Sequence, residues 1–259
     1  MIYNYHTHTA RCRHASDADE EYIISAINAG VKYLGFSDHA PFIFPDGFES
    51  TFRVEVKNVD DYFSSLKALR EKYKDKIDIK IGFELEYYPA YFPAMLDLCE
   101  ESGAEYLILG QHYIHNEHPD GRASILKTDD TDLLREYVNC VVGGIRTGVF
   151  TYVCHPDIFN FIGDISVYRK EMRRLCEASL EYETPLEINF LGIRDGRIYP
   201  KDVFWEIAGE VGAPVTFGFD AHRKEDAGDL DSLTKAGELV KKYGLRYIGM
   251  PRIIPPSNY

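Results

Sequence analysis

The chain of 259 residues alternates between strand-like and helix-like segments from one end to the other. Short runs rich in Val, Ile, Tyr and Phe are each followed by a segment with apolar residues at helical spacing. The predicted strands are residues 2–6, 33–37, 77–84, 105–112, 150–155, 186–189, 215–219 and 245–250. The predicted helices are residues 17–29, 58–73, 90–101, 132–146, 167–182, 202–209 and 233–242. Such alternation predicts a mostly parallel sheet covered by helices.

The number of units and the absence of linkers favour a single α/β domain spanning residues 1–259. Seven or eight β-α units fit the length of one α/β barrel. No G-x-G-x-x-G pattern follows the first predicted strand, so a dinucleotide-binding sheet has little support. Two predicted connections, residues 38–57 and 113–127, are longer than most. Long loops at the carboxyl ends of barrel strands tend to shape an active site.

Composition and charge exclude several classes of partner. The formal net charge of −13 argues against nucleic acid, which requires a basic surface. It leaves an anionic small substrate open, because bound metal ions can reverse the local charge. The first residues do not resemble a signal peptide, and no apolar run reaches the ~18 residues of a membrane span. The five cysteines are widely spaced and form no C-x-x-C pair, so we expect reduced thiols in a cytoplasmic protein.

Most of the nine histidines stand at the ends of predicted strands, together with two carboxylates. In a parallel barrel these ends lie on one rim, where barrel enzymes carry their catalytic groups. A single strand-end histidine is more commonly just a hydrogen-bonded polar residue, but so many at equivalent places indicate a metal centre. The residues in question are His6, His8, His39, Glu84, His112, His155, Asp220 and His222.

The spacing within two of these motifs has a physical reason. Residues i and i+2 of a strand point to the same side, so His6 and His8 can hold one ion together. Asp220 and His222 repeat this spacing near the other end of the chain. Imidazole combined with carboxylate suits zinc, iron or manganese. By contrast, His115 and His118 lie within a loop and are expected to be solvated. Glu86 is expected behind the ligands or on the surface.

Taken together, the motifs resemble the polymerase-and-histidinol-phosphatase (PHP) superfamily, and within it the histidinol-phosphate phosphatase family. The resemblance covers nearly the whole chain. It rests on H-T-H-T at residues 6–9, C-R-H-A at 12–15, S-D-H-A-P at 37–41, G-F-E-L-E-Y-Y-P at 82–89, L-G-Q-H-Y-I at 109–114, H-P-D at 155–157, L-E-I-N at 186–189, G-I-R at 192–194 and F-D-A-H-R at 219–223.

This resemblance implies a distorted (β/α)7 TIM-like barrel that holds three divalent transition-metal ions. The first ion is expected to be held by His6, His8, Glu84 and Asp220. The second shares Glu84 and is completed by His112 and His155. The third is expected between His14, His39 and His222. Phe219 and Gln111 stand where the family usually has smaller residues. These differences bear on the shape of the pocket more than on the ligands. The predicted strand at 245–250 exceeds the seven that the family implies.

The reaction that the resemblance implies is hydrolysis of L-histidinol phosphate to L-histidinol and phosphate, a step of histidine biosynthesis. We expect a hydroxide bridging the first two ions to attack phosphorus in line, with the third ion binding a phosphoryl oxygen. Glu84, Asp220 and His222 are the catalytic candidates.

Three arginines are candidates for contacting the substrate. Arg194 is the first, because a guanidinium offers two parallel donors to a phosphate; Arg122 and Arg197 are weaker candidates. Asp38 is expected behind the metal ligands. Aromatic residues of the two long loops, Phe42, Phe44 and Tyr113, could wall the imidazole of the substrate or simply pack within the loops.

Several alternatives remain open at the level of sequence. Another phosphatase or phosphodiesterase of the same superfamily fits the residue types equally well. An amidohydrolase-type barrel also begins with H-x-H, but no lysine stands at a predicted strand end to bridge its metals. A regulatory barrel without turnover is the alternative that is not an enzyme, although all nine ligand positions are filled. The chain is expected to be a monomer or a homodimer.

Overall fold

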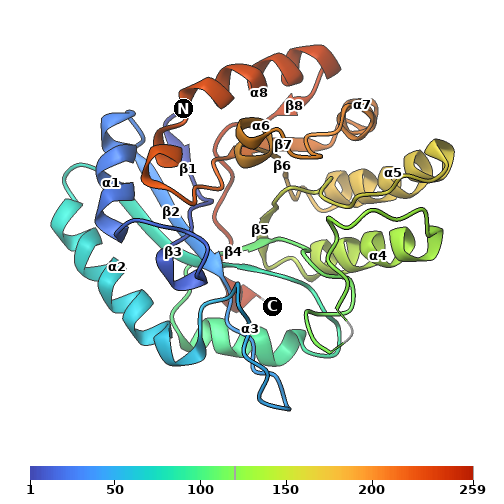
Figure 1. Cartoon of the computed structure of the whole chain (residues 1–259). Coiled ribbons are helices and arrows are strands. Elements are labelled where there is room, and N and C mark those ends of the chain that lie inside the picture. Colours follow the sequence, from blue (N-terminus) through green and yellow to red (C-terminus); the bar gives the residue numbers. More distant parts are fainter. Residues whose placement is uncertain (120, 259) are drawn as a thin grey trace.

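The computed structural model describes residues 1–119 and 121–258 and shows a curled parallel sheet surrounded by helices (Figure 1). Adjacent strands pair in sequence order, and every pair is parallel. The strands are β1 (Tyr3–Asn4), β2 (Tyr33–His39), β3 (Asp78–Leu85), β4 (Leu107–Leu109), β5 (Phe150–Val153), β6 (Leu186–Asn189), β7 (Pro214–Gly218) and β8 (Arg246–Tyr247). The predicted α/β, TIM-like fold is confirmed.

Helices fill the connections between the strands and form the outer layer of the molecule (Figure 1). They are α1 (Asp19–Asn28), α2 (Val59–Tyr73), α3 (Phe92–Glu101), α4 (Thr131–Thr147), α5 (Ile165–Glu181), α6 (Phe190–Asp195), α7 (Asp202–Val211) and α8 (Leu230–Tyr243). The sequence analysis did not predict α6, which begins directly after β6. Its six residues are too few to display helical periodicity. The Asn189 side chain caps it by accepting a hydrogen bond from the Gly192 N–H at 3.1 Å.

The sheet closes between β1 and the chain beyond β7, rather than through β8. Thr7 and Ala221 form a parallel bridge, in which the His8 N–H donates to the Ala221 carbonyl at 2.9 Å. At the opposite end, β8 pairs with the first residues of β7 and its two residues are exposed. The family's seven-stranded description therefore fits the closed part of the wall, and β8 is a short addition at its amino end.

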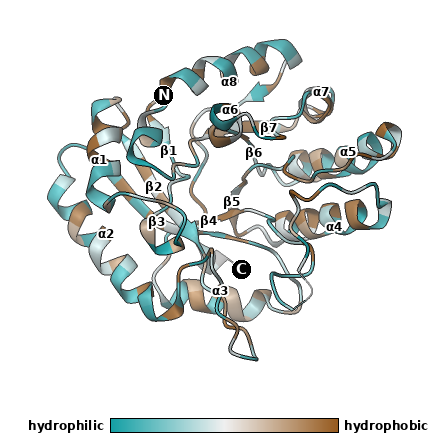
Figure 2. Cartoon of the chain, viewed as in Figure 1, coloured by the Kyte–Doolittle hydropathy of each residue, from teal (hydrophilic) through white to brown (hydrophobic). Residues whose placement is uncertain are grey.

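The helices pack through apolar faces that the sequence periodicity already marks (Figure 2). In α4, the buried side chains include Leu134, Val138, Val141 and Ile145, at spacings of three and four. The Asp130 side chain caps its first turn, and Gly148 ends it at φ 72°, where a Cβ would be strained. Within the described residues, no helix has both the length and the apolar character needed to cross a membrane.

The interior of the barrel is filled by a tyrosine-rich cluster beneath the carboxyl ends of the strands. It consists of Tyr3, Tyr5, Tyr106, Ile108, Tyr152 and Cys154, which come in i, i+2 pairs from three strands or their extensions. This spacing turns both members of each pair to the same side of the sheet. The cluster leaves only the carboxyl rim open for polar side chains, so the tertiary structure directs the histidines to one place.

Two long loops lie over this rim, and one buried arginine holds them both. Arg53 belongs to the loop between β2 and α2, and its side chain is 1% exposed. Its two terminal nitrogens donate to both oxygens of Glu86, at 2.7 and 2.8 Å, just beyond β3. Its Nε donates to Glu117, in the loop between β4 and α4, at 3.3 Å. This bidentate, buried pair joins both loops to the sheet.

We expect Arg53→Met to lower the free energy of unfolding by about 3–5 kcal/mol, because it leaves the buried Glu86 carboxylate without its bidentate cationic partner. Arg70→Met is the matched control. Arg70 pairs with Glu105 at 2.7 Å, but both side chains are about one-third exposed, so its loss should cost at most about 1 kcal/mol. Urea unfolding of the two variants measures the difference, and equal small losses would show that Arg53 does not hold the loops.

Candidate metal centre

Six of the strands deliver the predicted metal ligands to one rim, as the parallel topology requires. His6 and His8 follow β1, His39 ends β2 and Glu84 lies near the end of β3; His112, His155 and Asp220 follow β4, β5 and β7. Apart from His112, each of these side chains is 5% exposed or less. His155 and Asp220 have positive φ values of 32° and 48°, which are rare for residues with a Cβ and cluster at functional sites.

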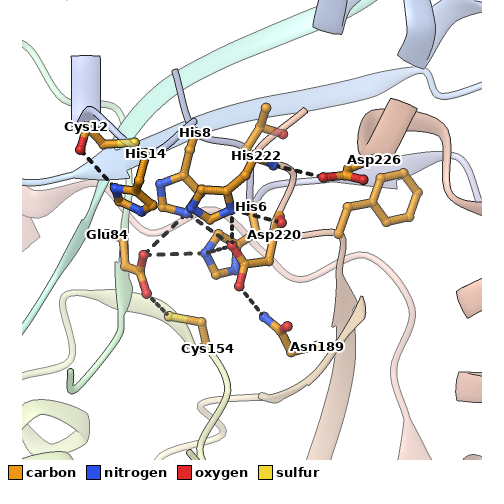
Figure 3. Close-up of polar contacts among 12 residues, drawn as sticks. His6, His8, Cys12, His14, Glu84, Cys154, Asn189, Asp220, His222 and Asp226 are labelled. Carbon is orange, nitrogen blue, oxygen red and sulfur yellow. Dashed lines mark hydrogen bonds and ion pairs between the residues drawn. The ribbon is translucent and has the colours of Figure 1, made fainter. Parts of the chain in front are cut away.

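Four buried ligand atoms converge on one point and make no hydrogen bond with any described residue (Figure 3). They are His6 Nε2, His8 Nε2, Glu84 Oε2 and Asp220 Oδ1. The two nitrogens lie 3.5 Å from Glu84 Oε2, and 3.6 and 3.2 Å from Asp220 Oδ1. Four ligands placed tetrahedrally at about 2.0–2.1 Å from zinc would be about 3.3–3.4 Å apart. The group therefore fits a first metal ion.

The other oxygen of Glu84 faces a second group of ligands. Glu84 Oε1 lies 2.8 Å from His155 Nε2 and 3.3 Å from His112 Nε2. The carboxylate thus points one oxygen at each group, which is the arrangement that a bridging ligand needs. A Cβ at Gly110 would collide with the Glu84 carboxylate, so only glycine leaves room for it there. The Cys154 thiol, which the sequence analysis missed, donates to the same oxygen at 3.0 Å.

A third group consists of His14, His39 and His222, whose nitrogens lie within 4.8 Å of one another. The same criterion joins Cys12 to His8 and His222. Burial and three neighbouring histidines lower the pKa of His39 well below its usual value, although Glu84 opposes them. A neutral imidazole is the form that binds a metal.

The electrostatics of the first group favour a positive charge at its centre. Burial lowers the pKa of His6, but the carboxylates of Glu187, Asp220 and Glu84 raise it to about 10. Burial raises the pKa of Glu84, yet the surrounding histidines hold it well below its usual value. Glu84 is therefore an anion that must be balanced by a cation, as expected of a metal ligand.

The nitrogens that face away from the predicted ions are held by carboxylates. His6 Nδ1 lies 2.8 Å from Glu187, His8 Nδ1 lies 3.3 Å from Asp38, and His112 Nδ1 lies 3.3 Å from Glu86. Such partners fix the orientation of a ligating imidazole. Asp38 thus lies behind a predicted metal ligand, His8. Glu86 is buried and is not a surface residue.

The strand β6 carries none of the nine predicted ligands but supports three of them, His6, His155 and Asp220. Asn189 Nδ2 donates to Asp220 Oδ2 at 3.0 Å (Figure 3). It also donates to Glu187 Oε2 at 2.8 Å. Glu187 also accepts a hydrogen bond from the His155 N–H at 3.0 Å. A Cβ at Gly218 would collide with Glu187, so β7 must carry a glycine beside it. The L-E-I-N motif held the signal for this role, because i and i+2 of a strand share one side.

A cavity of about 450 Å³ opens above the three groups. Seven of the nine predicted ligands line it: His14, His39, Glu84, His112, His155, Asp220 and His222. The other lining residues are Phe52, Ile158, Leu191, Asp195, Arg197, Tyr199, Arg223 and Asp226. One side of the cavity is thus charged and the other apolar, which suits a phosphate ester with a ring or chain attached.

Two of the arginines predicted to contact the substrate lie outside this cavity. Arg194 has its Nε 3.0 Å from Asp226 and a terminal nitrogen 2.9 Å from Asp229. Because these carboxylates already pair with it, we no longer expect Arg194 to bind the phosphate. Arg122 also lies outside the cavity and donates to the Lys127 carbonyl at 2.9 Å. Arg197 does line the cavity, and so does Arg223, which the sequence analysis missed although it quoted the F-D-A-H-R motif.

Among the loop aromatics, Phe52 is the one that reaches the cavity. Its ring centre lies 4.9 Å from His39 and 5.8 Å from His112. Phe42 and Phe44 instead pack against each other, with ring centres 4.5 Å apart, beside a separate cavity. His118, expected to be solvated, stacks on Phe48 at 4.1 Å and is 29% exposed.

Comparisons with known proteins agree with this arrangement. The family model of the PHP domain matches residues 4–190. The chain is 25% identical to a protein of Deinococcus radiodurans named "Probable histidinol-phosphatase", over 86% of this chain and 87% of the relative. It is 24% identical to the histidinol-phosphatase of Lactococcus lactis, over 93% and 91% of the two chains.

The fold is similar to that of a solved histidinol phosphate phosphatase from Lactococcus lactis, a complex with zinc, L-histidinol and phosphate. The TM-score is 0.72 at 21% sequence identity, and the match covers 98% of this chain and 97% of the other. This similarity shows that the two proteins share a fold. The site itself is described by the residues of this chain given above.

We expect Glu187→Gln to weaken zinc binding about 10- to 100-fold, because the amide is no anionic acceptor for His6 Nδ1. Competition with a coloured chelator measures the affinity. Glu183→Gln is the control, since Glu183 forms an exposed pair with Arg246 away from the site. Unchanged zinc affinity in Glu187→Gln would contradict the role of β6.

Proposed function

The chain belongs to the PHP domain family, and on that premise we propose that it is a metal-dependent phosphatase that hydrolyses L-histidinol phosphate to L-histidinol and phosphate. The observation that carries this proposal is the convergence of buried, unpaired ligand atoms at the floor of an open, partly cationic cavity. The proposed substrate is taken from the names of the relatives, which are given as histidinol-phosphatases. We further propose that residues 1–259 act as one domain and that the protein, with its five free thiols, works in the cytoplasm.

We propose three divalent ions. His6, His8, Glu84 and Asp220 hold the first; Glu84 is shared with the second, which His112 and His155 complete; His14, His39 and His222 hold the third. Zinc, manganese and iron all suit these ligands. When bound, such ions supply Lewis-acid chemistry, acidifying water and neutralising charge on phosphoryl oxygens.

The side chains above the predicted metal ligands bind different parts of the substrate. Arg197 offers guanidinium donors to the phosphoryl oxygens that the ions do not reach, and Arg223, whose Nε and Nη2 donate to Asp226, offers its Nη1. Phe52, Ile158 and Leu191 form the apolar part of the wall and suit the imidazole ring. This division replaces Arg194 and Arg122 as substrate contacts and keeps Arg197.

Protein purified without chelators is expected to carry about three transition-metal ions per chain, since three groups of ligands are assembled. Glu84→Gln should keep the fold but carry fewer ions and lose most activity, because a neutral amide cannot bridge two cations. Elemental analysis for zinc, manganese and iron, alongside circular dichroism, tests both statements. Less than one ion in the unmodified protein, with no uptake on dialysis, would refute the metal centre.

Histidinol phosphate should be hydrolysed with a higher kcat/KM than p-nitrophenyl phosphate, a sugar phosphate or a dinucleotide. The physical reason is that its imidazole ring can contact the apolar wall while its phosphate reaches the arginines and the ions. Steady-state assays of phosphate release over the four compounds decide the matter. If any competitor is turned over as well or better, the metal phosphatase stands, but the assignment to histidinol phosphate fails.

A further inference from the structure

Tyr199 is a buried residue of the cavity wall to which neither the sequence analysis nor the proposed function gives a role. It lies between α6 and α7, and 2% of its surface is exposed. Its ring centre is 5.9 Å from that of His155, and it lines the cavity together with Glu84 and Asp220. Gly192 of α6 packs directly against the ring, where a Cβ would collide. The side chain is therefore held in place at the edge of the metal centre.

The hydroxyl of Tyr199 is used in only one of its two capacities. A phenol can donate one hydrogen bond and can also accept. Arg197 Nη1 donates to the Tyr199 oxygen at 3.3 Å, which occupies the acceptor side. Among residues 1–119 and 121–258, no group accepts the phenolic proton.

Three other buried tyrosines differ in this respect, whereas the hydroxyls of Tyr152 and Tyr168, which do not line the cavity, also make no hydrogen bond with a described residue. The hydroxyl of Tyr106 donates to the Tyr5 carbonyl at 2.9 Å, that of Tyr62 to the Gly82 carbonyl at 2.9 Å, and that of Tyr137 to the Pro156 carbonyl at 2.8 Å. A buried donor left unused is costly unless a ligand accepts from it.

The other donors of the cavity wall are poor sources of a proton. Arg197 and Arg223 carry guanidinium groups, which do not give up a proton in proteins, and they already donate to Tyr199 and Asp226. Asp226 is engaged by Arg194 and Arg223.

We propose that Tyr199 is a catalytic residue that donates its phenolic proton to the leaving-group oxygen of the substrate. The inference rests on the proposed phosphatase function and concerns a step that the metal ligands do not perform. Arg197 positions the phenol by donating to its oxygen, so that the O–H bond is left to point at the substrate.

The step balances without any further reactant. Water adds its oxygen to phosphorus, and the bond between phosphorus and the ester oxygen breaks, leaving its electron pair on that oxygen. The proton of Tyr199 moves to the ester oxygen and completes the alcohol. One proton of the water stays on the phosphate, and the other restores the phenol. Ester and water thus yield alcohol and hydrogen phosphate.

The test compares Tyr199→Phe on two esters that differ in how much their leaving groups need a proton. The alkoxide of histidinol phosphate is a poor leaving group, whereas p-nitrophenolate leaves readily as an anion. We expect the variant to lose roughly 100- to 10,000-fold in kcat on the alkyl ester, and only a few-fold on p-nitrophenyl phosphate. Metal content should be unchanged, since the hydroxyl is no ligand in the proposed groups.

Tyr168→Phe is the matched control. Tyr168 is also a buried tyrosine whose hydroxyl makes no hydrogen bond with a described residue, but it lies on α5, outside the cavity. Its loss should leave both activities as in the unmodified protein.

Each other outcome overturns a distinct statement. An equal loss on both esters would mean that Tyr199 binds the phosphoryl group and does not protonate the leaving oxygen. No loss on either would remove it from catalysis. If the unmodified protein acts on another alkyl phosphate but not on histidinol phosphate, the substrate assignment fails and the comparison is made with that ester. If it hydrolyses no phosphate ester, the proposed function and the role of Tyr199 fail together.

Discussion

The contacts of the Glu84 carboxylate are the interaction on which the arrangement of the rim depends. One oxygen faces His6, His8 and His39, and the other faces His112 and His155. Four strands must therefore end at matching heights around one side chain that leaves β3. An anion surrounded in this way is stable in a buried place only if positive charge lies close to it. The histidines can supply it by protonation, and a bound cation supplies it more effectively.

A layer of carboxylates behind the imidazoles connects the centre to the rest of the fold. Each of three carboxylates contacts one histidine. Asp38 of β2 contacts His8, Glu86 just beyond β3 contacts His112, and Glu187 of β6 contacts His6. Glu86 also pairs with Arg53, which in turn pairs with Glu117. Both long loops are therefore joined through direct contacts to His112, one of the predicted ligands. The loop that carries Arg53 also brings Phe52 over His39 and His112. Loop position, imidazole orientation and the shape of the cavity are therefore physically linked.

The polar residues that contact substrate in our proposal, Arg197, Tyr199 and Arg223, come from the segments after β6 and β7, where prediction from sequence was weakest. Arg194 and Arg197 are three positions apart, and nothing in their spacing distinguishes them. The short helix α6 decides the matter, because Asp226 and Asp229 engage Arg194 while the chain beyond the helix turns Arg197 and Tyr199 toward the cavity. A helix of six residues leaves too little periodicity to be read from sequence.

The sequence by itself determined the α/β alternation, the parallel rim and the residues that gather there, because each of these follows from local periodicity and from the rule that parallel strands end on one side. All nine predicted ligands lie within the three groups. Tertiary structure alone decided that Cys154 and His155, neighbours in sequence, both reach Glu84, since the positive φ of His155 breaks the alternation of the strand. It also decided that β1 meets the chain beyond β7, that β6 supports the ligands, and which arginines are already paired. These outcomes depend on contacts between residues far apart in the chain, and local patterns carry no information about them.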